Sequence, residues 1–280
     1  MEVLQLLDFY YNSLTELSQA LRNNQIDLLS FVSEISDRLD NTEPVVEAFL
    51  PEPNRRQRLI EEAELLLEEF PNPSERPPFF GIPVGIKDLF HVDGMETQGG
   101  SRLPSEALSG AQSSIVSALK KNGALILGKT TTEEFAYHGH PPTRNPHNHR
   151  HTPGGSSSGS AASVAVGSCP FAIGTQTLQS VIAPASFCGV VGFKPSYGRV
   201  PLDGVIFLSP SIDTIGFFSQ TVESMEFACS NLISDWTPSV SSQKPVLGIP
   251  NGVYMTLMFD EVRRAFEEIV NALDDIKSRK

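Results

Sequence analysis

Residues 151–193 read HTPGGSSSGSAASVAVGSCPFAIGTQTLQSVIAPASFCGVVGF and contain no Asp, Glu, Lys or Arg. Glycine, serine, threonine, glutamine and proline interrupt this run at short intervals, so it holds no apolar stretch of about 18 residues that could cross a membrane. We interpret the run as a buried central hairpin of secondary-structure elements whose hydroxyl and backbone N–H groups face a site. A site shielded from water and stray charge is the environment in which a serine can become a nucleophile.

Composition and charge narrow the classes of function. The chain has 280 residues, of which 40% are hydrophobic and 19% charged, so it can bury a core as an ordinary globular protein does. Its formal net charge of -12 argues against direct nucleic-acid binding, which needs clustered lysine and arginine to neutralise phosphates. We therefore expect no direct nucleic-acid partner, and no motif in the chain indicates a cofactor.

Cysteine usage and the N-terminal residues predict a cytoplasmic protein. The three cysteines, Cys169, Cys188 and Cys229, are widely spaced and form no CxxC motif, which fits a reducing compartment better than a disulfide framework. The first residues include Glu2 and Asp8 and lack the basic segment of a signal peptide. We expect a cytoplasmic location and no membrane association.

The first 75 residues are predicted to be helical. Apolar residues recur at helical spacing up to about residue 50, which indicates two amphipathic helices, and a third helix with a solvated, glutamate-rich face is expected at 54–70. The proline-rich segment 71–78 ends this helix because proline cannot continue it. We expect residues 1–75 to form an N-terminal helical segment that packs on a core of residues 76–280, within one domain.

From residue 79 onward, short apolar runs alternate with helical segments. Strands are predicted at 81–88, 124–129, 209–221 and 246–249, and helices at 112–122, 222–233 and 260–276. A further helix is expected to begin at Thr131, where Glu134 completes a capping box. Strands separated by helices indicate an α/β fold, in which Lys87, near the end of the first strand, shares a domain with the uncharged run.

Five of the six histidines lie between His138 and His151. Three of them, His147, His149 and His151, alternate in a proline-rich loop, a pattern that raises the question of a metal site. Alternation in a loop does not by itself produce tetrahedral geometry, and no cysteine or carboxylate is interleaved. We therefore interpret the segment as a surface loop or the rim of a cleft, and expect no metal.

Two parts of the uncharged run carry candidate chemistry. Gly154 and Gly155 permit unusual backbone angles, and the serine- and alanine-rich segment after them can begin a helix whose first N–H groups point at a site. Further on, Ser180 follows a turn, where a serine is either a nucleophile or a plain capping residue. Ser180 does not lie in a GxSxG motif, and no histidine is suitably placed to act as its base. A nucleophilic Ser180 would therefore be activated by a lysine, either directly or through a second hydroxyl.

Several separate blocks of the sequence resemble the amidase signature family. They are GIPVGIKD, GKTTTEEFA, PTRNP, TPGGSSSGSAASVA, GTQTLQS, PASFCGVVGFKPSYGRV and SIDTIGFF, in the family's order and with similar gaps, and they cover residues 79–223 closely. The resemblance implies an α/β fold with a mixed central sheet flanked by helices on both faces, of which the C-terminal part is missing here. It also implies an amide hydrolase that converts a small-molecule carboxamide to a carboxylate and ammonia or an amine.

The resemblance assigns a Ser–cis-Ser–Lys triad to three positions. By motif, Lys87 is the base, Ser156 is the bridging serine after a cis peptide bond, and Ser180 is the nucleophile that forms an acyl-enzyme. The oxyanion hole that the family pattern implies consists of backbone N–H groups, those of Thr177, Leu178, Gln179 and Ser180.

The turn before Ser180 departs from the family pattern. A glycine usually stands where this chain has Gln179, and an arginine usually follows the nucleophile where this chain has Ile182 and Ala183. Gln176 replaces an aspartate that can pair with that arginine, so no buried charge is left unpaired. The chain is also shorter than family members. Two alternatives therefore stay open: a truncated or degenerate amidase with a non-catalytic role, and a component similar to the A subunit of an amidotransferase, which works with a partner chain. A homodimer is also compatible with the sequence.

Overall fold

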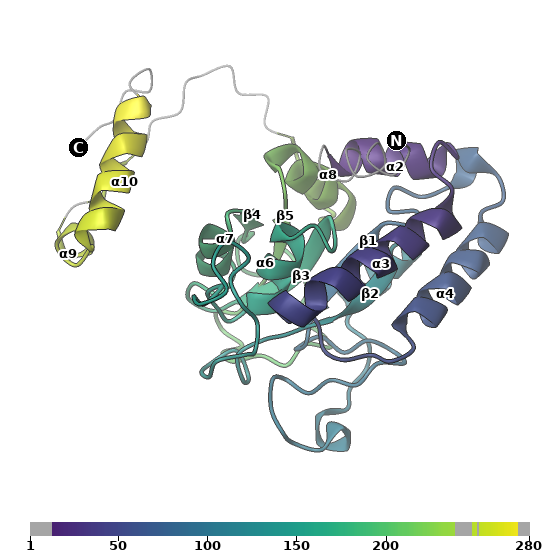
Figure 1. Ribbon diagram of the computed structural model, residues 1–280, viewed down its shortest axis with the longest axis horizontal. Helices are drawn as coiled ribbons and strands as arrows, with labels where there is room; N and C mark the ends of the chain where they lie inside the picture. The colour runs from purple at the N-terminus through teal and green to yellow at the C-terminus, as the bar shows by residue number, and fades with distance from the viewer. Residues whose placement is uncertain (1–12, 239–247, 251, 274–280) are drawn as a thin grey trace. The chain divides into compact units, whose positions relative to one another are not determined.

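The computed structural model describes residues 13–238, 248–250 and 252–273, and the chain forms two compact units, residues 1–236 and 237–280. The elements of the first unit (Figure 1) are α2 (Leu14–Arg22), α3 (Leu28–Val46), α4 (Arg55–Glu69), η1 (Pro73–Glu75), β1 (Pro83–Lys87), η2 (Ser105–Leu108), α5 (Ser114–Lys121), β2 (Leu125–Thr130), α6 (Ser158–Ala165), β3 (Phe171–Gln176), α7 (Ile182–Cys188), β4 (Val191–Phe193), β5 (Thr214–Ser219) and α8 (Val222–Leu232). The second unit contains α9 (Val253–Thr256) and α10 (Asp260–Ala272). Helices α2, α3 and α4 belong to the same unit as the sheet, and the domain boundary at residue 75 stays a prediction.

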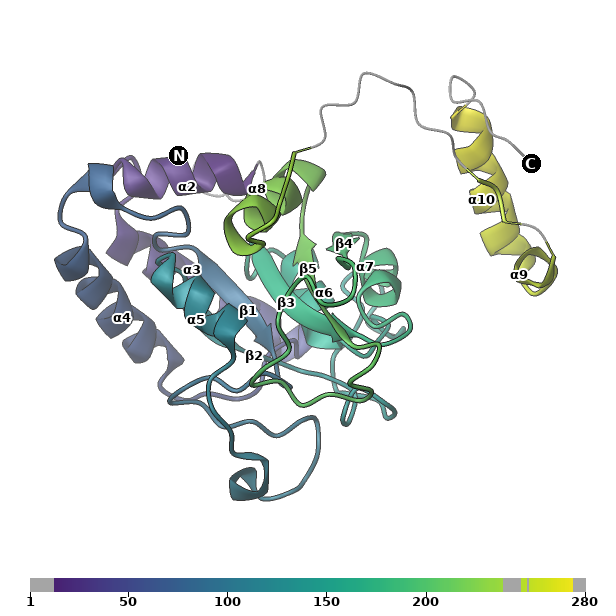
Figure 2. The same cartoon turned by 180° about the vertical axis from the view of Figure 1, so that it is seen from behind.

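Five strands form one mixed sheet in the order β2-β1-β3-β5-β4. Strand β1 pairs in parallel with β2 and with β3, whereas β5 pairs antiparallel with both β3 and β4. Helix α6 lies on one face of the sheet (Figure 1), and α5 and α8 lie on the other (Figure 2). The predicted α/β fold, with a mixed sheet between helices, is therefore confirmed.

The uncharged run folds into α6, β3, α7 and β4, and α6 and β3 are buried. The predicted hairpin is wrong, because helices alternate with the strands. Small residues allow this arrangement: a Cβ on Gly159 would lie 2.1 Å from the carbonyl oxygen of Ala48, so only glycine lets α6 approach so closely. The hydroxyl of Ser160 donates to the Ile173 carbonyl at 3.0 Å, so this buried polar group is satisfied without any charge.

An irregular turn follows β2, so the prediction of a helix that begins at Thr131 and is capped with Glu134 is wrong. Some backbone N–H groups of this segment bond to distant parts of the chain, whereas those of Ala136 and Tyr137 close only short local turns. The backbone N–H of Thr131 donates to the Ala48 carbonyl at 3.0 Å, and the backbone N–H of Glu133 donates to the Ser156 carbonyl at 3.1 Å. The backbone turns left-handed at Phe135 and Ala136, with φ of 50° and 59°, so the local capping signal, which is only a weak preference, does not lead into a helix.

The other predicted helices of the first unit are confirmed. Helix α3 begins after Asp27, whose carboxylate accepts from the backbone N–H of Ser30 at 2.9 Å, as an N-cap does. Residues 1–12, where the first helix is expected to begin, lie outside the described residues, as does most of the predicted strand 246–249. None of the helices in the described ranges is long and apolar enough to span a membrane.

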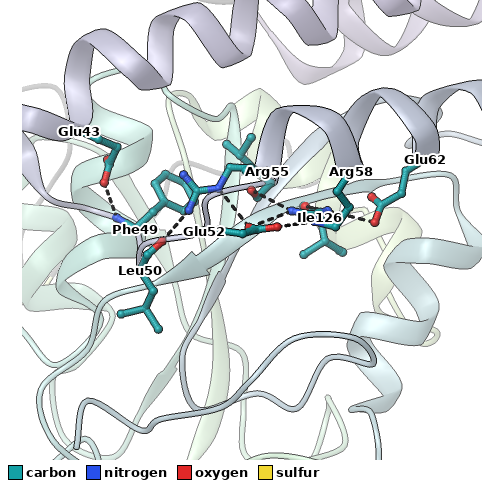
Figure 3. Close-up of polar contacts among 9 residues, drawn as sticks. Glu43, Phe49, Leu50, Glu52, Arg55, Arg58, Glu62 and Ile126 are labelled. Atoms are coloured by element: carbon teal, nitrogen blue, oxygen red, sulfur yellow. Dashed lines mark hydrogen bonds and ion pairs between the residues drawn. The ribbon is translucent and has the colours of Figure 1, made fainter. Parts of the chain in front are cut away.

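Charged side chains join α4 to the edge of the sheet (Figure 3). Arg58 donates to Glu52 at 2.5 Å and to Glu62 at 3.0 Å, and its Nη1 donates to the Ile126 carbonyl at 2.9 Å. Arg55 pairs with the same Glu52 carboxylate at 3.2 Å. Ile126 lies in β2, an edge strand whose outer backbone groups need partners. Arg58 therefore fixes α4 and also covers the sheet edge.

Replacing Arg58 with methionine is expected to lower the free energy of unfolding by about 2 kcal/mol, because Glu52 and the Ile126 carbonyl lose a shared donor in a half-buried place. Arg56 on the same helix is the matched control, since it pairs with two exposed aspartates. Replacing Arg56 with methionine should change stability by less than about 1 kcal/mol. Urea unfolding measures both values, and equal losses would contradict this role of Arg58.

Candidate active site

Lys87 lies at the carboxyl end of β1 and is fully buried. Its Nζ donates to Ser156 Oγ at 2.8 Å, to Thr175 Oγ1 at 2.9 Å and, more weakly, to the Thr175 carbonyl at 3.4 Å. Strands β1 and β3 run parallel, with Ile86 opposite Ile173, so their carboxyl ends bring Lys87 and Thr175 together. The structure thus places the predicted base directly against the predicted bridging serine.

Burial lowers the pKa of Lys87 to about 7, although the nearby carboxylates of Glu133 and Asp213 act in the opposite direction. An ordinary lysine has a pKa of about 10.4 and is protonated at neutral pH. Lys87 is therefore neutral in a large fraction of molecules near pH 7, and its amine can accept a proton there. Burial also raises the pKa of the Glu133 carboxyl. The charges of Lys87, His140 and His138 partly offset this increase.

Ser156 is 1% exposed and follows a cis peptide bond, Gly155–Ser156, which the family resemblance implies. A Cβ on Gly155 would lie 2.1 Å from Glu133 Oε1, so a side chain there would require the Glu133 side chain to move. The Ser156 carbonyl accepts from the backbone N–H of Glu133. The irregular turn after β2 therefore helps to hold the segment that carries the bridging serine.

Ser180 lies in the turn between β3 and α7 and is 9% exposed. Its carbonyl accepts from the backbone N–H of Ser157 at 3.3 Å, which holds the Ser180 segment beside the Ser156 segment. Within residues 13–238 no hydrogen bond joins the hydroxyls of Ser156 and Ser180. The structure therefore brings all three predicted residues into one region, with a direct side-chain contact between Lys87 and Ser156.

The predicted oxyanion residues form the outer part of this turn. Thr177 is partly buried, whereas Leu178 and Gln179 are exposed. The Thr177 hydroxyl donates to the carboxylate of Asp213, which also accepts from the backbone N–H of Leu208 at 2.6 Å. Positive φ occurs at four non-glycine residues of the described part, and Gln179 is not among them. Gln179 therefore does not adopt the left-handed backbone conformation that favours glycine.

Three residues of the site were not predicted to have a role: Thr175, Glu133 and Asp213. Each lies in a block that carries the family resemblance, but the local pattern does not show which side chains turn toward Lys87. A signal exists for Asp213, since it is a lone carboxylate directly before a buried apolar strand. A charge in such a place needs partners, and its 3% exposure together with its hydrogen bonds agrees with this rule.

The histidine-rich loop is tied to the end of α7. His147 Nε2 lies 2.8 Å from the Cys188 carbonyl oxygen, and the backbone N–H of His147 donates to Asn145 Oδ1 at 2.9 Å. Among the residues that the structure describes, no group of three or more His, Cys, Asp or Glu side chains is arranged to hold a metal ion. The contacts shown by this loop are thus structural, and they support the helix that follows Ser180.

Comparison with known proteins gives a consistent result. A family model described as amidase matches residues 30–278. The chain is 33% identical over 231 residues to the A subunit of glutamyl-tRNA(Gln) amidotransferase from Staphylococcus carnosus (strain TM300), a match that covers 80% of this chain and 47% of the relative. It is 38% identical over 216 residues to the protein of the same name from Synechococcus sp. (strain WH7803), covering 75% of this chain and 44% of the relative. The chain therefore spans about half the length of the curated relatives it matches.

Solved structures show the same likeness. A crystal structure of an amidase superimposes with a TM-score of 0.82 at 33% identity, over 95% of this chain and 62% of the other. The native peptide amidase from Stenotrophomonas maltophilia superimposes with a TM-score of 0.70 at 30% identity, over 81% of this chain and 48% of the other. Fatty acid amide hydrolase, at 20% identity and a TM-score of 0.84, shares the fold.

Proposed function

The chain belongs to the amidase family, and from this premise we propose that it hydrolyses the C–N bond of a small carboxamide through an acyl-enzyme on Ser180. The observation that carries the proposal is the 2.8 Å hydrogen bond between Lys87 Nζ and Ser156 Oγ. A fully buried amine with a pKa of about 7, held against a hydroxyl, has the properties of a general base.

The proton path runs from Ser180 to Lys87 by way of Ser156. Ser180 Oγ attacks the amide carbonyl carbon while its proton passes to Ser156 Oγ, and the proton of Ser156 passes to Lys87 Nζ. When the C–N bond breaks, the proton returns through Ser156 to the leaving nitrogen, which departs as ammonia or an amine. Water then attacks the ester on Ser180 by the same path, and the carboxylate is released. The cycle balances with water as the only co-reactant.

Charge that develops on the carbonyl oxygen needs hydrogen-bond donors. The donors that we propose are backbone N–H groups of the turn before the nucleophile, those of Thr177, Leu178, Gln179 and Ser180. The exposure of Leu178 and Gln179 supports this assignment, since a substrate must reach the turn from its open side. Loss of one such donor typically lowers the rate by roughly 100- to 1000-fold.

A second candidate function rests on the names of the relatives. Several are the A subunit of glutamyl-tRNA(Gln) amidotransferase, and a chain of that kind would pass the ammonia released at Ser180 to a partner chain instead of to solvent. Copurification with a second chain, and hydrolysis that depends on it, would favour this alternative. A non-catalytic role is a third alternative, motivated by Gln179 and Ala183. A cytoplasmic location stays a prediction from the sequence.

A fluorophosphonate tests the proposed nucleophile directly. Attack by an activated serine displaces fluoride, so we expect a stable adduct at a stoichiometry of about one per chain, located on Ser180 by peptide mapping. Ser180→Ala should carry no adduct, and it should release no ammonia from short aliphatic or aromatic primary amides. Labelling at a different residue, the absence of labelling, or unchanged ammonia release in Ser180→Ala would contradict the proposal.

A further inference from the structure

Gln176, the last residue of β3, bonds through both polar atoms of its side-chain amide to the turn that carries the proposed nucleophile. Nε2 donates to the Leu178 carbonyl at 3.0 Å, while Oε1 accepts from the backbone N–H of Val181 at 2.9 Å and of Ile182 at 3.0 Å. The residue is 6% exposed, so water competes little for these bonds. One buried amide therefore bonds to the backbone on both sides of Ser180.

The bond to Leu178 sets the direction of the next N–H group. The cis peptide of the described residues is Gly155–Ser156, so the bond between Leu178 and Gln179 is trans. In a trans peptide the C=O of one residue and the N–H of the next point in opposite directions. Because the Leu178 carbonyl turns toward the amide of Gln176, the N–H of Gln179 points away from it. This is one of the N–H groups of the proposed oxyanion hole.

The same side chain also starts the following helix. The N-cap residue of α7, Val181, has no side-chain acceptor. Gln176 Oε1 serves instead, because it accepts hydrogen bonds from the backbone N–H groups of Val181 and Ile182. On the opposite side, the Ser180 carbonyl is held by Ser157. The backbone of Ser180 is thus restrained by hydrogen bonds from two directions.

Glutamine suits this position because it both donates and accepts without a charge. An ionised carboxylate here would accept from the helix N–H groups but could not donate to the Leu178 carbonyl. It would also add a carboxylate to those of Glu133 and Asp213, which already act on Lys87. The neutral amide therefore orders the turn and leaves the charge state of the base to be set by burial.

We propose that Gln176 is the positioning residue of the nucleophile turn, whose amide holds residues 177–182 in the conformation that presents the Ser180 hydroxyl and the Gln179 N–H to a substrate. This inference rests on the function proposed for Ser180. The amide of Gln176 would keep the turn ordered although this chain lacks the glycine usual at 179 and has Ile182 and Ala183 where an arginine usually follows the nucleophile.

Two substitutions and one control test the proposal. Gln176→Met removes all three hydrogen bonds, and Gln176→Glu keeps the shape but removes the donor and adds a charge. Gln112→Met is the matched control, because Gln112 also bonds at both ends, to Asp93 N and to Ser117, on an exposed surface away from the turn. Hydrogen exchange of peptides that cover 177–183, kcat and KM for a primary amide, and the rate of fluorophosphonate labelling are measured for each chain.

Gln176→Met is expected to speed exchange in 177–183 at least about 10-fold, with β5 peptides unchanged, and to lower kcat and the labelling rate about 30-fold with KM within about 3-fold. Gln176→Glu is expected to shift the midpoint of the pH–rate profile upward, because its carboxylate joins Glu133 and Asp213 in favouring protonated Lys87. Unchanged exchange and kcat in Gln176→Met, or an effect of equal size in Gln112→Met, would overturn the proposal. Faster exchange in Gln176→Met alongside an unreactive wild type would support the restraint of the turn and contradict only the function proposed for Ser180.

Discussion

Replacing Lys87 with methionine is expected to reduce amide hydrolysis by about 10,000-fold and, at neutral pH, to raise the free energy of unfolding. Methionine keeps an unbranched apolar side chain but removes the amine that accepts the proton. Stability should rise because Lys87 is fully buried, and burial disfavours its charged form. The two hydroxyls left without their donor offset part of the gain, so we expect a net increase of about 1–3 kcal/mol at pH 7.

Proton binding sets the sign of this effect. The pKa of Lys87 is lowered to about 7 in the native chain, against about 10.4 in an unfolded one, so between these pH values the unfolded chain binds more protons. The stability penalty is therefore fully present below about pH 7 and is relieved as the pH rises toward about 10. Lys87→Met lacks this penalty. The difference in free energy of unfolding between the variant and the wild type should therefore shrink by roughly 2 kcal/mol between pH 7 and pH 9.

Lys129 is the matched control for this experiment. It is a second buried lysine, but its Nζ lies 2.8 Å from a carboxylate oxygen of Asp88, which has no exposure. Lys129→Met leaves that carboxylate buried without its cation and should lower the free energy of unfolding by about 3 kcal/mol. Denaturant unfolding at both pH values, together with ammonia release, separates the two lysines. A Lys87→Met chain that is less stable than the wild type at pH 7, or that still hydrolyses amides at the wild-type rate, would contradict the argument.

The contrast between these lysines also shows what sequence patterns can and cannot predict. Lys87 ends β1 and Lys129 is the next-to-last residue of β2, and both strands could be predicted because an apolar run between helices is a local signal. The partner of each lysine is not local. Lys87 meets a serine 69 residues away, while Lys129 meets a carboxylate on the neighbouring strand end. The role of Lys87 therefore comes from the family resemblance, not from its surroundings in the sequence.

Strand register explains why the role of Asp213 could not be predicted. Gln176 pairs with Thr214 in the antiparallel β3–β5 ladder, so Asp213 falls beside Thr177 at the start of the nucleophile turn. That register depends on which strands are neighbours, and neighbours cannot be read from the periodicity of one strand. The helix predicted after β2 is absent for a different reason, because Phe135 and Ala136 adopt positive φ, which ends a helix and which the capping residues do not reveal.

Ser156→Ala is expected to slow hydrolysis about 1000-fold, although Lys87 stays in place. Distance alone does not identify the hydroxyl that passes the proton, since Lys87 Nζ donates to Ser156 Oγ at 2.8 Å and to Thr175 Oγ1 at 2.9 Å. Both segments contact the nucleophile turn, since Ser157 bonds to the Ser180 carbonyl and Gln176 bonds to Leu178 and Val181. The family resemblance assigns the bridging role to Ser156, and the expected loss follows from that assignment.

Thr175→Val provides the matched control, because valine has the shape of threonine and removes only the hydroxyl. In this variant Lys87 still has Ser156 as a hydrogen-bond partner, so we expect less than about a 10-fold loss of kcat. Fluorophosphonate labelling should slow in Ser156→Ala in parallel with hydrolysis, since the same proton must leave Ser180 in both reactions. A larger loss in Thr175→Val than in Ser156→Ala would move the relay to the strand hydroxyl. Equal, small losses in both would mean that Ser180 gives its proton to Lys87 without an intermediate, and the bridging role of Ser156 would have to be abandoned.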